Sequence, residues 1–230
     1  LDPSATLKDQ LVESIPQEFI PKGWPWQRRK ARLRIAQQIM RKVGIKDVHA
    51  AINKYPHELS LDICQKFMIA MALVSQPTLL IADDPTRGME TNTKQQILTL
   101  LAQLNKTRNL SILFVSHDLI AISAMAHSMT VLYCGQSVES GKMKAMRRRP
   151  LHPYTKALMD SAPSFSPDLI PKSPLVAMDG TIPTLQHLPI GCRLGPRCPR
   201  AAKECVQVPE ERSINEHKYR CHYPMHVESV

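Results

Sequence analysis

The chain has 230 residues, 19 of them proline, and a formal net charge of +10. A chain of this length can bury the core of one large domain, and it contains no run approaching the ~20 apolar residues that a membrane-spanning helix needs. The charge could indicate a nucleic-acid partner, but aromatic side chains are few and no nucleic-acid motif is present, so a solvated basic surface or a nearby anionic membrane leaflet explains the charge better.

The N-terminal third of the chain is expected to contain an irregular segment followed by two helices. Prolines punctuate residues 1–26, so we expect irregular structure there. Residues 27–43 carry apolar side chains at helical spacing opposite a basic face, which predicts an amphipathic helix with Gly44 as its C-cap. The apolar run 59–74 predicts a long buried helix.

Strands and helices then alternate along the chain. We expect strands at 78–83, 110–116 and 128–134 and helices at 91–105 and 117–126. Such alternation is typical of an α/β domain with a mostly parallel sheet and flanking helices. A further helix is expected to start at Pro153, within the segment His152-Pro153-Tyr154-Thr155, to which we assign no chemistry.

Two of these strands end in side chains that suit a nucleotide site. Asp83 and Asp84 end the first, and His117 follows the second. Ligands of open α/β sheets bind outside the carboxyl ends of the strands. One carboxylate can hold Mg²⁺, the next can polarise an attacking water, and the histidine can contact a γ-phosphate. Aspartates are also common where strands end, but the two strands in this order favour nucleotide hydrolysis.

Six cysteines occur in the sequence. Cys64 and Cys134 lie in expected core elements and are interpreted as buried thiols. The other four lie in an irregular, proline-rich tail: Cys192, Cys198, Cys205 and Cys221. Four thiols could bind a [4Fe–4S] cluster or Zn²⁺ or remain free, whereas disulfides are disfavoured if the protein is cytosolic. The lack of a CxxC pair makes zinc binding the weaker hypothesis. His217 and His222 lie near Cys221 and are fallback ligands.

These motifs together resemble a known family. Residues 79–86 (LLIADDPT) and 113–118 (LFVSHD) are similar to the C-terminal half of the ATPases of ABC peptide and oligopeptide transporters. The HPYT segment and residues 188–199 (LPIGCRLGPRCP) are similar to the tail of the same family, so the resemblance covers nearly all of the chain. Within the family, the chain is most similar to the D subunits of Sap-type antimicrobial-peptide transporters.

Carried over by position, the resemblance implies a role for each candidate residue. Asp83 corresponds to the Walker B aspartate that binds Mg²⁺, Asp84 to the catalytic carboxylate and His117 to the switch histidine. Ser60 and Gln65 fall in the signature segment, which binds nucleotide. The resemblance also implies an iron–sulfur cluster on the four tail cysteines, with Zn²⁺ as the alternative.

The chain departs from the family pattern in several places, including the segment 87–90 (RGME), where the family has a SALD-like D-loop. The signature LSGGQ reads LSLDICQ at residues 59–65, without either glycine. Asp84 replaces the family's glutamate, which withdraws the carboxylate by about 1 Å and predicts slow hydrolysis. None of the eight glycines lies in a GxxxxGK[ST] phosphate-binding loop (P-loop). We therefore expect an N-terminally truncated chain that begins just past the Q-loop.

The resemblance also implies an organisation and partners. The expected parts are residues 1–57 (helical subdomain), 58–150 (C-terminal half of the ATPase core) and 151–230 (cysteine-bearing extension). ATP and Mg²⁺ would be the cofactors, and permease subunits and a second ATPase subunit the partners, with no nucleic acid. The protein would energise peptide import as a peripheral subunit at the cytoplasmic face of the bacterial inner membrane, and this chain would be inactive alone. The alternative is a non-catalytic docking or regulatory module with an iron–sulfur or zinc site.

Overall fold

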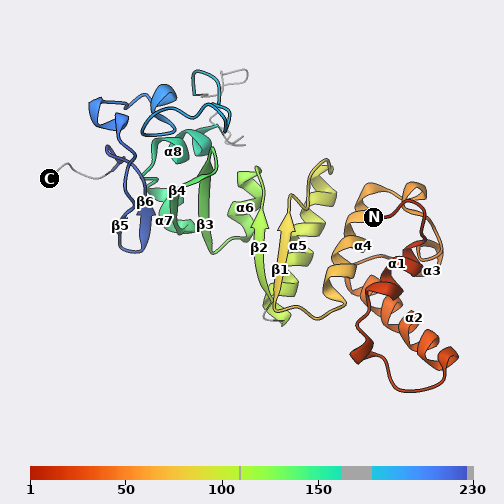
Figure 1. The fold of residues 1–230 in the computed structure, drawn as a ribbon. Helices are drawn as coiled ribbons and strands as arrows, with labels where there is room; N and C mark the ends of the chain where they lie inside the picture. Colours follow the sequence, from red (N-terminus) through yellow and green to blue (C-terminus); the bar gives the residue numbers. More distant parts are fainter. Residues whose placement is uncertain (109, 162–177, 227–230) are drawn as a thin grey trace. The chain divides into compact units, whose positions relative to one another are not determined.

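A computed structural model of the chain describes residues 1–108, 110–161 and 178–226. Part of the expected extension, residues 162–177 and 227–230, therefore lies outside the described residues. The chain divides into two units, Leu1–His117 and Asp118–Val230, and each is treated by itself. Figure 1 traces the elements of both.

Helices form the first part of unit one. They are α1 (Leu7–Ser14), α2 (Pro25–Lys42), α3 (Val48–Ala51) and α4 (Leu61–Leu73), with 3₁₀ turns η1 (Gln17–Phe19) and η2 (Pro56–Glu58). Their shared core contains fully buried side chains from α1, α2 and α4: Leu7, Leu11, Met40, Phe67 and Leu73. The two helices predicted at 27–43 and 59–74 are confirmed as α2 and α4.

The ends of these helices follow from local chemistry. Gly44 follows the C-cap of α2 with φ +82°, a conformation that costs glycine nothing because it has no Cβ. The expectation of irregular structure throughout 1–26 was wrong for α1. There the Thr6 side chain caps the helix by accepting from the Asp9 backbone N–H, and Leu7 and Leu11, one turn apart, are both buried.

A βαβ segment completes unit one. Strand β1 (Leu79–Asp83) pairs in parallel with β2 (Ser111–Val115), and α5 (Thr91–Arg108) connects them. Figure 1 shows α5 alongside the two strands, and its Ile97 and Leu101 are fully buried. The strands also carry large apolar side chains that are about half exposed: Leu79, Ile81, Leu113 and Val115. Since parallel sheets are usually covered on both faces, this apolar face is unusual.

Unit two contains an antiparallel sheet. Its elements are α6 (Leu119–Met125), β3 (Ser128–Tyr133), β4 (Gln136–Lys142), α7 (Met143–Arg148), α8 (Pro153–Asp160), η3 (Gly195–Arg197), η4 (Lys203–Val206), β5 (Arg212–Ile214) and β6 (His217–Tyr219). The strand order is β3-β4-β6-β5, and all its pairs are antiparallel. The prediction of a mostly parallel sheet was therefore wrong, because it holds only for β1 and β2.

A tight turn explains the difference. Cys134 and Gly135 between β3 and β4 both have positive φ (46° and 77°), as in the two-residue turns that fit the twist of a hairpin. The strand predicted at 128–134 therefore ends at Tyr133. Cys134 is a half-buried turn residue rather than part of a core strand. Because Cys-Gly is not a usual hairpin signal, the sequence did not indicate the turn.

A buried carboxylate connects three segments of unit two. The Glu139 side chain on β4 is fully buried and accepts hydrogen bonds from the backbone N–H groups of Leu151 and His152, both at 2.8 Å. Its Oε1 also lies 2.6 Å from Nε2 of His217 on β6. His217, a fallback metal ligand in the sequence analysis, is thus a hydrogen-bond partner of Glu139. This cluster ties the HPYT segment and β6 to the β3–β4 hairpin.

The tail is held to the hairpin mainly by arginines. Arg193 donates to the backbone oxygen of Cys134, and Arg197 donates to the hydroxyl of Tyr133 at 3.3 Å and to the backbone oxygens of Met178 and Asp179. Leu194 is buried in the core cluster of unit two. Gly191 is required where the tail folds back, because a Cβ there would lie 2.4 Å from the backbone oxygen of Cys205.

His152 is expected to make unit two acid-sensitive. Its buried ring accepts from the Tyr154 backbone N–H at 3.1 Å, and burial lowers its pKa from 6.5 to about 4. The unfolded chain then binds the proton more readily, so the free energy of unfolding should fall as the pH drops from 6.5 towards 4, by about 3 kcal/mol in total.

Urea unfolding across this pH range checks the effect. His152→Asn keeps a side-chain oxygen that can cap α8 but cannot titrate, so the difference between wild type and His152→Asn should narrow on acidification. A difference that stays constant between pH 7 and pH 4 would contradict the prediction.

Candidate nucleotide site

The acidic pair lies at the carboxyl edge of the parallel strands. Asp83 is the exposed last residue of β1 and is in register with Val115. The backbone N–H of Asp84 donates to the Val115 oxygen at 2.8 Å. The Asp84 carboxylate accepts from Oγ of Ser116 at 3.2 Å and lies 3.2 Å from Nδ1 of His117. The site thus joins the ends of two strands that are adjacent only in the fold.

The backbone conformation of Asp84 sets the direction of its carboxylate. Its φ is +46°, a left-handed conformation in which aspartate is enriched because its short side chain can hydrogen-bond locally. The His117 side chain is 77% exposed and that of Asp84 26% exposed. A side-chain contact this exposed contributes little stability, so His117 can turn towards a ligand at small cost.

The structure brings together three of the predicted site residues and adds one. Asp83, Asp84 and His117 share one edge, as their positions at strand ends indicated. Ser116 was missed, although its position directly after β2 placed its hydroxyl at the same edge. Among the described residues, no hydrogen bond or ion pair links Ser60 or Gln65 to the acidic pair.

The signature segment forms the start of α4. Ser60 is the exposed N-cap residue, and its hydroxyl bonds to the carboxylate of Asp62, which lowers the pKa of that carboxyl. Lys66 lies 3.6 Å from the same carboxylate. A Cβ added to Gly88 would lie 3.7 Å from Leu61, so the segment touches the loop that follows the acidic pair. Gln65 is half-buried on α4.

The acidic pair suits Mg²⁺ as one part of a ligand set. Mg²⁺ is usually held by one or two carboxylates, with waters and substrate phosphates completing the octahedron. Asp83 offers hard oxygen ligands on an exposed edge, which fits that arrangement. Within the part of the chain that the structure describes, no three His, Cys, Asp or Glu side chains are grouped to hold a metal unaided.

The four tail cysteines lie near one another but do not form a ligand set. All four are half-buried free thiols. Burial, reinforced by the other three thiols, raises the pKa of Cys221 to about 12. Cys192 and Cys198 pack on the core cluster of unit two. As placed in the described residues, these thiols are not grouped as a ligand set for a cluster or a zinc ion.

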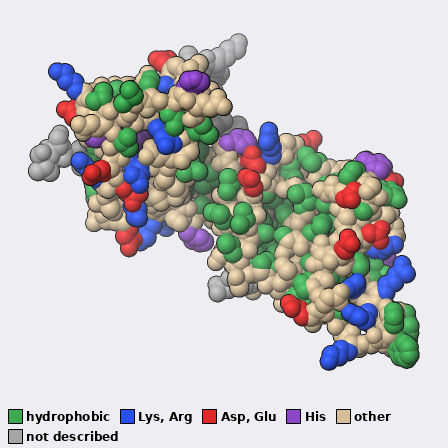
Figure 2. All heavy atoms as spheres, in the orientation of Figure 1, with side chains coloured by type: hydrophobic (Ala, Val, Ile, Leu, Met, Phe, Trp, Pro, Cys, Tyr) green, Lys and Arg blue, Asp and Glu red, His purple; other side chains and the backbone are tan. Residues whose placement is uncertain are grey.

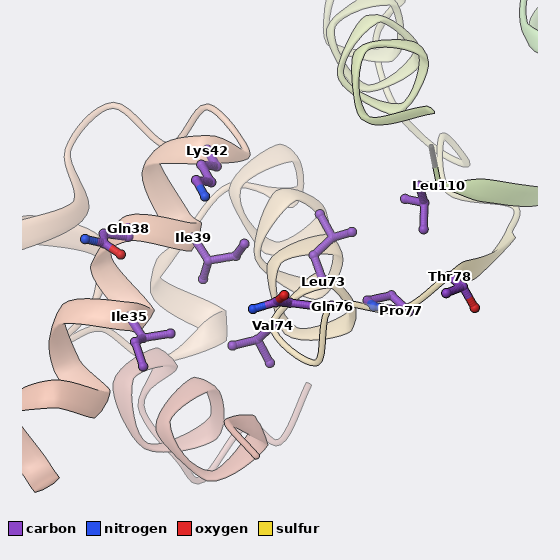
Figure 3. Close-up of a pocket in the computed structure, with 10 residues that line it drawn as sticks. All are labelled: Ile35, Gln38, Ile39, Lys42, Leu73, Val74, Gln76, Pro77, Thr78 and Leu110. Carbon is purple, nitrogen blue, oxygen red and sulfur yellow. The ribbon is translucent and has the colours of Figure 1, made fainter. Parts of the chain in front are cut away.

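Unit one also contains a cavity of about 630 Å³ (Figure 3). It lies between α2, the end of α4 and the start of β1, and its lining mixes apolar side chains with Gln38, Lys42 and Gln76. The residues that line this cavity do not include Asp83, Asp84 or His117. The cavity is therefore separate from the acidic edge.

Comparison with known proteins shows the fold and the family of the chain. The family model "ABC transporter" matches residues 1–87, and the model "Oligopeptide/dipeptide transporter, C-terminal region" matches residues 138–205. The dimeric structure of MJ0796, a bacterial ABC transporter cassette, aligns with a TM-score of 0.52 at 23% identity, over 62% of this chain and 59% of that one. This likeness shows the ABC cassette fold, and the chain spans only 59% of that cassette's length.

Sequence relatives cover the chain almost completely. The peptide transport system ATP-binding protein SapD of Escherichia coli is 47% identical over 99% of this chain and 69% of that protein. SapD of Haemophilus influenzae is 42% identical over 99% of this chain and 65% of its own length. The dipeptide transport ATP-binding protein DppD of Escherichia coli K12 is 36% identical over 98% of this chain and 67% of its own length.

Each helix among the described residues is too short or too polar to cross a membrane. Together, the strand-edge carboxylates, the fold and the relatives identify the chain as a member of the ABC transporter ATPases, in the family of ATP-binding subunits of peptide transport systems.

Proposed function

We propose that this chain is the part of an ATP-hydrolysing subunit that carries the catalytic edge and the transporter-specific tail, and that it energises peptide import. The observation that carries the proposal is the Asp84 carboxylate, held by Ser116 and His117 at the carboxyl edge of β1 and β2. The peptide and dipeptide transport named for SapD and DppD supports a peptide as the cargo.

The residues at this edge would have separate tasks. Asp83 would bind Mg²⁺, which when bound neutralises charge on the ATP phosphates. Asp84 would orient the attacking water and accept its proton, and Ser116 would hold that carboxylate in place. His117 would turn its exposed ring to the γ-phosphate. Ser60 and Gln65, at the start of α4, would contact nucleotide bound by a second subunit.

The phosphates also need a P-loop, which the 230 residues do not contain. We propose that a segment outside this sequence supplies it. The half-exposed apolar side chains of β1 and β2, such as Ile81 and Leu113, support this, because parallel strands are normally covered on both faces. A covering segment would complete the sheet and the nucleotide site together.

The expected partners are proposals of the same kind. A second ATPase subunit would face the signature segment, and permease subunits would receive the helical part, with the protein peripheral at the cytoplasmic face of the inner membrane. The MJ0796 cassette, whose structure is described as dimeric, supports a second subunit. We retain 1–57, 58–150 and 151–230 as the functional parts.

Nucleotide binding by the full-length protein tests the proposal. We expect saturable, Mg²⁺-dependent binding of a fluorescent ATP analogue that Asp83→Asn weakens. Asp160→Asn, which removes an exposed carboxylate paired with Lys156 in unit two, is the matched control and should bind normally. A full-length protein without saturable binding would overturn the proposal.

A non-catalytic docking or regulatory module is the second candidate. It is favoured by Leu61 and Asp62, which stand where family members have glycines. The hydrogen bond from Ser60 lowers the pKa of Asp62, and the negative charge of this carboxylate would repel phosphate. The binding experiment separates the two candidates, because a docking module would show no Mg²⁺-dependent affinity for ATP.

We further propose that the cysteine tail receives a [4Fe–4S] cluster, with Zn²⁺ as the alternative. The proximity of the four thiols supports this, although their present placement is not a ligand set. Protein purified without oxygen is expected to contain iron or zinc that Cys221→Ser removes and the control Cys64→Ser retains. Metal-free wild-type protein with all six thiols titratable would contradict the prediction.

A further inference from the structure

The N-terminal end of α2, together with its N-cap residue, exposes both tryptophans of the chain. All side chains of residues 21–30 are exposed, and Trp24 and Trp26 are 71% and 65% exposed. In Figure 2, hydrophobic side chains protrude in the region where Figure 1 draws the start of α2. Large aromatic side chains usually bury most of their surface, so two exposed indoles only two positions apart indicate a surface with a partner.

The charges beside the tryptophans all have one sign. Residues 19–46 contain no acidic side chain and nine basic ones: Lys22, Arg28, Arg29, Lys30, Arg32, Arg34, Arg41, Lys42 and Lys46. None of the nine forms an ion pair within the described residues; Arg28 instead donates to the neutral amide of Gln17 at 2.6 Å. The surface therefore complements an extended negative charge.

The local backbone holds this surface in place. The Gln27 side chain accepts from the Trp24 backbone N–H at 3.1 Å, and Pro25 is the first residue of α2. These two features fix the position of the tryptophan backbone before any partner binds. Less conformational entropy is then lost on binding.

We propose that Trp24 and Trp26, together with Lys22, Arg28, Arg29 and Lys30, form a membrane-binding patch that inserts its indoles at the headgroup level of an anionic bilayer. Indoles gather at membrane–water interfaces, and neighbouring Lys and Arg side chains bind anionic headgroups. Trp and Arg also occur at protein interfaces, but a run of nine basic side chains without one acidic residue fits the uniform negative charge of an anionic bilayer better. The partner is lipid itself, in addition to the permease contact proposed above.

The patch contains its own spectroscopic probe. Because the chain has only two tryptophans, its tryptophan emission reports on Trp24 and Trp26 alone. Adding phosphatidylcholine vesicles that contain phosphatidylglycerol to the intact chain should shift this emission to the blue, and brominated lipid should quench it. Vesicles of pure phosphatidylcholine should have a much weaker effect. No shift with anionic vesicles at low salt would overturn the proposal.

Matched variants test the patch by vesicle co-sedimentation. Arg28→Gln/Arg29→Gln/Lys30→Gln should weaken binding about a hundredfold, since each basic residue contributes roughly a factor of five. Trp24→Ala/Trp26→Ala should weaken it about tenfold or more. The control Arg147→Gln/Arg148→Gln/Arg149→Gln removes the same charge from exposed positions at the end of α7.

Two results would point elsewhere. Equal losses in the two triple variants would mean that binding follows net charge only. Binding to vesicles that contain permease, with none to protein-free anionic vesicles, would assign the patch to a protein partner. Either result would overturn the lipid proposal, and neither depends on whether the chain binds ATP.

Discussion

Replacing Asp84 by glutamate in the full-length protein is expected to raise ATP turnover, by up to about 10²-fold. The longer side chain would move the carboxylate about 1 Å further towards the attacking water. Asp84→Asn should instead lower turnover by about 10²-fold or more, because it removes the proton acceptor. Steady-state phosphate release at saturating ATP and Mg²⁺ measures both changes.

Asp84→Glu is also expected to lower the stability of the protein. Asp84 has φ +46°, and glutamate tolerates this conformation less well than aspartate, so Asp84→Glu should unfold at a lower temperature than wild type. Ser116→Ala, which removes one contact to the carboxylate, should lower turnover by a smaller factor than Asp84→Asn. Unchanged turnover in Asp84→Glu, with nucleotide still bound, would show that carboxylate length does not limit hydrolysis.

Removing the buried carboxylate of Glu139 is expected to give the largest loss of stability in unit two. Glu139→Ala leaves two backbone N–H groups and His217 without their acceptor, and breaking such a buried cluster costs about 3–5 kcal/mol. Glu139→Gln should lose less, because its amide oxygen still accepts one hydrogen bond. Urea unfolding, and hydrogen exchange at the amides of Leu151 and His152, measure the loss.

The chain offers a matched control for this prediction. Glu216 pairs with Lys142 at 2.9 Å, but its side chain is 77% exposed, so Glu216→Ala should change stability far less. If Glu139→Ala does not fold, the comparison of Glu139→Gln with Glu216→Ala still tests the role of the cluster. A loss no larger than that of Glu216→Ala would show that the buried cluster does not hold the segments together.

Local patterns were sufficient to predict most of unit one. Helices α2, α4 and α5 and strands β1 and β2 lie within about two residues of their expected bounds, apart from three residues at the end of α5. Their side chains repeat with the period of the element that they form, so the information is local. Helix α1 was missed because its eight residues lie between prolines that suggested irregular structure.

Contacts between distant residues could not be predicted in the same way. Glu139 and His217 are 78 residues apart, and neither position carries a pattern that indicates its partner. The hairpin turn at Cys134-Gly135 lacks the usual turn residues, and β5 and β6 have only three residues each. Such short strands are stabilised by the sheet that they join, so their own sequence contains little signal.

The sequence by itself determined the candidate nucleotide site: the residue types of Asp83, Asp84 and His117 and their positions at strand ends. The tertiary structure alone decided how they are held. The parallel register of β1 with β2 places Ser116 and His117 against the Asp84 carboxylate, and the positive φ of Asp84 aims it. The tertiary structure alone also decided that Trp24 and Trp26 are exposed and that Glu139 is buried. Exposure and burial depend on what the rest of the folded chain covers, which no local pattern contains.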